Sequence, residues 1–182
     1  MHSAFPHCSR LIASAFLASV ALAALPTGAA ADNPQIVNVV GCAWDIETPG
    51  KTTVQAGEQI ILHFGWGAKT RGLVTDFIGA ADYTLTVNDQ DKPDVDDLWG
   101  APFYVPESPP DPAYWRAWVS YPIEALAPDT SVLVTLDLYL AHRLHDGFSY
   151  DGAPHPTFFG PGWFFGDEGP IGCQITAVNP TV

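Results

Sequence analysis

Aromatic residues concentrate near the end of the chain, in a segment from 142 to 170 that is interrupted by glycines and prolines. Exposed Trp and Tyr rings stack on sugars and other flat ligands, whereas Phe rings more often cover a protein's own core. The segment therefore predicts either a lid over the core or a ligand platform, and five of its seven rings are Phe, which favours the lid. If it is a platform, the candidate ligand-binding residues are Tyr150, Trp163 and Phe164.

A group of aspartates in the stretch 88–100 has the residue types of a calcium site. Several carboxylates within one loop can coordinate calcium together with backbone carbonyls and water. The EF-hand pattern is not met, because Pro93 interrupts the loop and no glycine stands at its sixth position. The stretch predicts either a weak calcium site or a solvated turn, and the candidate ligands are Asp89, Asp91, Asp94 and Asp96.

Known catalytic motifs do not occur in the sequence, which has no GxSxG, no HExxH and no glycine-rich phosphate loop after a strand. Asp146 with Asp167 or Glu168 has the residue types of a glycoside hydrolase pair. An acidic chain supplies such pairs by chance. We therefore expect no enzymatic activity, and a glycoside hydrolase is the least favoured alternative.

Lys69 and Arg71 are two of only seven basic residues and lie between two predicted strands. They are expected to pair with Asp76 or Asp82, or to contact an anionic partner.

Residues 1–31 have the pattern of a secretory signal peptide. Arg10 precedes an apolar run, and small residues with Ala29 and Ala31 at the −3 and −1 positions follow it. The apolar run is too short for a transmembrane span, which needs about 20 residues. We expect cleavage after Ala31, a secreted or extracellular protein, and no stable membrane insertion after cleavage.

The net charge of the chain limits the classes of molecule that it can bind. The full chain has a formal net charge of −13 from 7 basic and 20 acidic residues, and removal of Arg10 with the leader makes it 6 − 20 = −14. Nucleic acid is excluded as a partner because phosphate binding needs a basic patch. The expected partners are an extracellular protein or a glycan.

Two cysteines remain after the leader, Cys42 near the start and Cys173 near the end. An oxidising compartment and an even number of cysteines predict one disulfide between them. It is expected to join the first and last strands.

Alternating apolar residues predict β-strands along most of residues 32–182, which we expect to form one domain. The strongest runs are Gln59–Trp66, Tyr83–Asn88 and Val132–Leu140, and 35–40, 114–121 and 171–178 add further strands. Helix signals are weak, and the stretch 75–83 predicts one short turn. The pattern indicates an all-β, antiparallel sandwich of about seven strands.

Two stretches resemble known domains. Thr52–Phe64 resembles a hairpin of bacterial immunoglobulin-like modules, with an Ala-Gly turn between two strands. Leu126–Leu136 resembles the corner before strand F of fibronectin type III domains, although Val132 stands where that family has a tyrosine. The whole chain looks like secreted bacterial immunoglobulin-like proteins of no assigned activity. That resemblance implies an immunoglobulin-like sandwich in which 142–170 is a long F–G insert.

These observations favour a secreted, non-catalytic binding or adhesion module. The first alternative is a carbohydrate-binding domain that uses the aromatic residues of the 142–170 insert.

Overall fold

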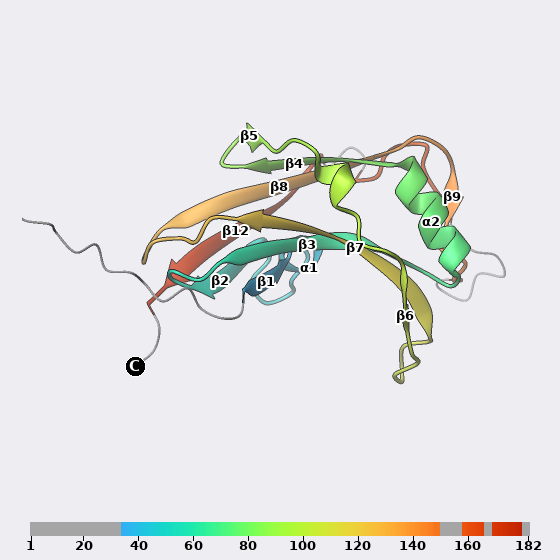
Figure 1. Ribbon diagram of the computed structural model, residues 1–182, viewed down its shortest axis with the longest axis horizontal. Helices are drawn as coiled ribbons and strands as arrows, with labels where there is room; N and C mark the ends of the chain where they lie inside the picture. The colour runs from blue at the N-terminus through green and yellow to red at the C-terminus, as the bar shows by residue number, and fades with distance from the viewer. Residues whose placement is uncertain (1–33, 150–157, 166–168, 180–182) are drawn as a thin grey trace, which may run out of the picture.

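The computed structural model describes residues 34–149, 158–165 and 169–179, and the strands of two main sheets are its dominant elements (Figure 1). The first sheet has the order β1 (Gln35–Asn38), β3 (Ile60–Ala68), β7 (Tyr114–Ile123) and β6 (Phe103–Val105). The second has the order β2 (Lys51–Gln55), β12 (Ile171–Val178), β8 (Ser131–Leu140), β4 (Ala81–Val87) and β5 (Gln90–Asp91). The prediction of an all-β fold is confirmed.

The two sheets enclose one hydrophobic core, because every second residue of the long strands points between them. From the first sheet, Leu62 and Phe64 of β3 are fully buried. From the second, Leu136 of β8 and Ile175 of β12 are fully buried in the same cluster. In Figure 1, β4 and β8 form one layer and β3 and β7 form the other. The architecture is therefore sandwich-like.

Strand pairing is mixed, so the prediction of a purely antiparallel sandwich is wrong. β1 pairs with β3 in parallel, and β2 pairs with β12 in parallel. The predicted hairpin between β2 and β3 is also absent from the described ladders, since these strands belong to different sheets. The Ala56-Gly57 turn does form, with Gly57 at φ +81°, but it carries the chain from one sheet to the other.

Two helices replace segments expected to be strand or turn. Helix α1 (Val39–Ala43) ends the first strand early, because the Asn38 side chain accepts a hydrogen bond from the Gly41 N–H and caps the helix. Helix α2 (Arg71–Ala80) is longer than the predicted turn. Its N-cap is Thr70, which accepts from the Leu73 N–H, and it buries Val74, Phe77 and Ala80. A short 3-10 helix, η1 (Val95–Leu98), follows β5.

The disulfide between Cys42 and Cys173 is present, with 5.7 Å between the two Cα atoms. Cys42 lies in α1 rather than in the first strand, so the bond joins α1 to β12. The prediction of the pair is confirmed, and the expectation that it joins the first and last strands is wrong because α1 begins at Val39.

The described residues between β8 and β12 form three short strands. β9 (Leu144–His145) pairs with β10 (Phe158–Phe159), and β11 (Gly162–Trp163) pairs with β8. Within the described residues, no helix is both long and apolar enough to span a membrane.

Candidate functional site

Three Phe rings of the insert pack inward around Trp66. The Trp66 ring stacks on Phe77 of α2 at 4.3 Å and meets Phe159 and Phe164 edge-on at 5.2 and 5.7 Å. Phe165 continues this cluster through an edge contact with Phe164 at 5.4 Å. All three Phe side chains are half-buried against the hydrophobic core. These rings therefore cover part of the hydrophobic core.

Trp163 lies outside that cluster. It is 56% exposed, and β11 places it directly opposite Tyr139 of β8, which is 39% exposed. The two rings meet edge-on at 5.4 Å. Of the predicted ligand-binding residues, Trp163 is thus on the surface and Phe164 packs against the core, while Tyr150 lies outside the described residues. Tyr139 was not predicted as a ligand-binding residue, although the alternation of Val132–Leu140 places it on the outward face of its strand.

Polar side chains surround the Tyr139–Trp163 pair on the outer face of the second sheet. Asp82 of β4 is the register partner of Tyr139, and Asp137 precedes Tyr139 by two residues on the same face of β8. Thr84 stands opposite Asp137. Carboxylates and hydroxyls beside two exposed rings can accept and donate hydrogen bonds to a ligand that stacks on those rings.

A group of three acidic residues, Asp82, Asp96 and Asp97, lies next to this face. Burial raises the pKa of Asp96, and the neighbouring carboxyl groups of Asp82 and Asp97 raise it further. The Tyr83 N–H, which donates to Asp96 Oδ1 at 3.3 Å, acts in the opposite direction. These three carboxyl groups concentrate negative charge beside Tyr139, the register partner of Asp82.

The predicted calcium ligands are spread over three local elements. Asp89 is in the turn between β4 and β5 at φ +60°, and Asp91 is in β5. Asp94 precedes η1 at φ +57°, and Asp96 is within η1. In the part of the chain that the structure describes, no three His, Cys, Asp or Glu side chains form a group able to hold a metal ion.

The carboxylate of Asp146 is buried and accepts a hydrogen bond from the Phe148 N–H at 2.9 Å. Asp167 and Glu168, its predicted catalytic partners, lie outside the described residues.

A serine–histidine contact, which the sequence did not indicate, lies on the outer face of the first sheet. Ser120 Oγ is 2.9 Å from His63 Nε2, and His63 stacks on Trp118. Burial lowers the pKa of His63, and Arg116 adds to the shift. Ser120 and His63 are cross-strand neighbours of β7 and β3, which accounts for the contact.

The two basic residues singled out in the sequence do not pair with Asp76. Asp76 instead lies 3.2 Å from His142, and this is the single ion pair among the residues described. The Lys69 N–H donates to the Asp146 carbonyl at 2.7 Å, and the Arg71 guanidinium lies 5.8 Å from the centre of the Trp115 ring.

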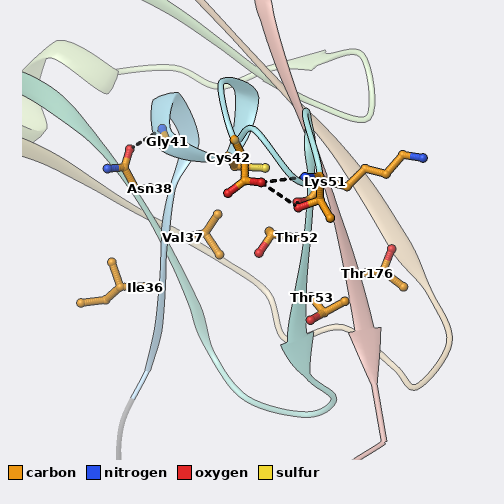
Figure 2. Close-up of a pocket in the computed structure, with 11 residues that line it drawn as sticks. Ile36, Val37, Asn38, Gly41, Cys42, Lys51, Thr52, Thr53 and Thr176 are labelled. Carbon is orange, nitrogen blue, oxygen red and sulfur yellow. Dashed lines mark hydrogen bonds between the residues drawn. The ribbon is translucent and has the colours of Figure 1, made fainter.

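A cavity of about 540 Å³ lies where the chain crosses between the sheets. Figure 2 shows Val37 and Thr52 between the ribbons of β1 and β2, with Thr176 beyond them on β12. Its lining is rich in hydroxyl groups. Asp45, which also lines it, already accepts from the Glu47 and Thr48 N–H groups. These bonds lower the pKa of Asp45, the Thr48 bond first.

Comparison with family models, with curated proteins and with solved structures gives no match to this chain.

Proposed function

We propose that this chain is an exported, non-catalytic binding module that holds an extracellular glycan on the outer face of its second sheet. The observation that carries the proposal is the Tyr139–Trp163 pair, in which Trp163 is 56% exposed beside carboxylates. Three Phe rings of the same insert pack on the core, whereas Trp163 lies on the surface opposite Tyr139.

A glycan suits this face for two reasons. Sugar rings present apolar C–H faces that stack on Trp and Tyr, and their hydroxyl groups donate to carboxylates such as Asp137. The acidic chain disfavours a polyanionic ligand, so the glycan is proposed to be neutral.

The strand order supports an immunoglobulin-like arrangement of the domain. In such sandwiches, strands A, B, E and D form one sheet, and G, F, C and C′ form the other. The order β1–β3–β7–β6 corresponds to the first set, and β12–β8–β4–β5 corresponds to the second. The parallel strand β2 adds to β12 at the edge. In this reading, residues 142–170 are the F–G insert.

Export is proposed from the leader pattern of residues 1–31, and a disulfide is compatible with an oxidising compartment. N-terminal sequencing of the secreted product is expected to begin at Asp32. A product that retains Met1 would contradict this part of the proposal.

The test is a saturation-transfer NMR screen of the secreted protein against neutral oligosaccharides. Trp163→Ala is expected to weaken binding at least about tenfold, the effect of losing one stacked ring. Trp44→Ala is the matched control, because Trp44 is 58% exposed and its ring contacts Phe165 rather than the Tyr139–Trp163 pair. Equal affinity of the wild type and Trp163→Ala would refute the glycan site.

A protein partner is the second candidate, and a separate observation favours it. Ile36, at 61% exposure, lines the cavity shown in Figure 2, and Trp44 and Ile46 flank Asp45 of the same lining. Exposed apolar residues beside a cavity are typical of protein contact surfaces. Under this candidate, Ile46→Asp abolishes adhesion to the partner, whereas Trp163→Ala leaves it unchanged.

A further inference from the structure

Arg116 is held in an unusual way on the outer face of the first sheet. Its guanidinium carbon lies 3.5 Å from the centre of the Trp118 ring, and Nη1 donates to the Tyr114 hydroxyl at 3.3 Å. Trp118 and Tyr114 follow and precede Arg116 by two residues in β7, so the three side chains share one face. The guanidinium is fixed from both sides along the strand.

Glycines in β3 make room for this row. Gly67 is the register partner of Arg116, and a Cβ there would lie 3.2 Å from the Tyr114 ring. Gly65 is the register partner of Trp118, and a Cβ there would meet the Ala117 carbonyl at 2.1 Å. Gly67 therefore leaves room for the Tyr114 ring, and Gly65 permits the close approach of the β3 and β7 backbones beside Trp118.

Arg116 lacks a carboxylate partner in the described structure, although the chain has 20 acidic residues. The single ion pair of the described residues is His142–Asp76. In addition, the Arg116 Nε–H is buried without an acceptor. A buried donor left without an acceptor costs about 1–3 kcal/mol, so such groups call for a specific explanation.

A cavity of about 520 Å³ adjoins Arg116. Tyr114 and Phe148 supply aromatic surface, while Asp111 and Ser149 supply polar groups. This volume is within the range of small-molecule sites.

We propose that this cavity binds the carboxylate of a small ligand carrying a single negative charge, with Arg116 as the anion-binding residue and Tyr114 and Phe148 as its aromatic walls. The guanidinium fork matches a carboxylate bidentately. The ligand oxygen would also supply the acceptor that the buried Nε–H lacks. Asp111 and the net charge of the chain disfavour ligands with several negative charges. This site lies on the opposite sheet from Trp163 and does not depend on the glycan proposal.

Titration calorimetry of the secreted protein with sodium D-glucuronate and sodium benzoate tests the site, with D-glucose and benzyl alcohol as neutral analogues. Binding of either carboxylate but not of its neutral analogue is expected. Binding of glucuronate but not of benzoate would identify the ligand as an acidic sugar. Binding of benzoate but not of glucuronate would identify it as an aromatic acid.

Arg116→Gln is expected to weaken binding of the carboxylate at least about tenfold, and Arg116→Lys to weaken it less. The controls are Arg143→Gln, which removes a guanidinium stacked on Phe158 at 4.2 Å, and Trp163→Ala. Both should leave the affinity unchanged. If Arg116→Gln fails to fold, the Arg116 Nε–H resonance of the wild type must shift on addition of the carboxylate. Absence of wild-type binding, equal binding of the neutral analogue, or an unaffected Arg116→Gln variant would overturn the proposal.

Discussion

Two aromatic regions of this molecule are built from one short segment and differ in what the rings contact. Phe164 lies 5.7 Å from Trp66 in the cluster that covers the core. Trp163, the preceding residue, lies 5.4 Å from Tyr139 on the open face of the second sheet. Trp163 is the last residue of β11 and Phe164 directly follows the strand, so two consecutive residues place one ring outward and the other inward.

The comparison shows that the partner of a ring, rather than its type, determines its role. Trp66 is a tryptophan in the inward cluster, and Trp163 is a tryptophan on the open face. The inward rings stabilise the fold. The outward pair leaves aromatic surface available to a ligand.

The largest expected effect is on the inward region and comes from the disulfide. In Cys42→Ser/Cys173→Ser, the free energy of unfolding is expected to fall by about 4–5 kcal/mol, because the bond closes a loop with a sequence separation of 131. Denaturant unfolding of the variant and of the oxidised wild type measures this difference in the free energy of unfolding. A loss below about 1 kcal/mol would show that α1 and β12 are held together without the bond.

Substitution of adjacent rings tests the comparison directly. Phe164→Ala is expected to lower the free energy of unfolding by roughly 2–3 kcal/mol, since it removes a half-buried ring from the Trp66 cluster. Trp163→Ala should lower it by about 1 kcal/mol or less, the value of one edge-on ring contact. Thermal and urea unfolding of both variants provide the measurement. The reverse order of effects would place Trp163 in the core.

The smallest expected effect concerns the acids beside the open face. The pKa of Asp96 is raised in the folded protein, so the folded state binds a proton more tightly than the unfolded state. Stability is therefore expected to rise as pH falls through the folded pKa, and to fall as pH rises through it. Asp96→Asn should remove this dependence and slightly raise Tm at neutral pH, while the exposed control Glu107→Gln should not. An unchanged pH profile of Tm would contradict the assignment.

The alternation of apolar and polar residues made most of the strands predictable from the sequence. The runs that contain β3, β4, β7, β8 and β12 alternate clearly, and all five strands form. The turn before β8 also forms, with Asp129 at φ +58° and the Thr130 hydroxyl donating to the Ala127 carbonyl at 2.7 Å. Strand direction was not predictable, because alternation specifies which face a residue occupies but not the neighbour of its strand.

Helix α2 was underestimated for a physical reason. Gly72 and Gly79 and the β-branched Val74 and Thr75 lower its intrinsic helix propensity. Tertiary packing stabilises it, since Val74, Phe77 and Ala80 are buried. The Thr70 cap and the three-residue spacing of those buried positions were signals available in the sequence.

The candidate site was predictable only in part. Trp163 stood out among the rings of the insert, but its partner Tyr139 is 24 residues earlier in β8, and only the β11–β8 pairing brings them together. Arg116 gave no local signal, because its environment depends on glycines in another strand.

The most direct test of the two-region account is a proton–nitrogen NMR titration of the secreted protein with the oligosaccharide that the screen selects. The chain has six tryptophans, so the indole N–H signals report on both regions at once. The account predicts that the Trp163 signal shifts with ligand while the Trp66 and Trp44 signals stay in place. A stationary Trp163 signal at saturating ligand would contradict it.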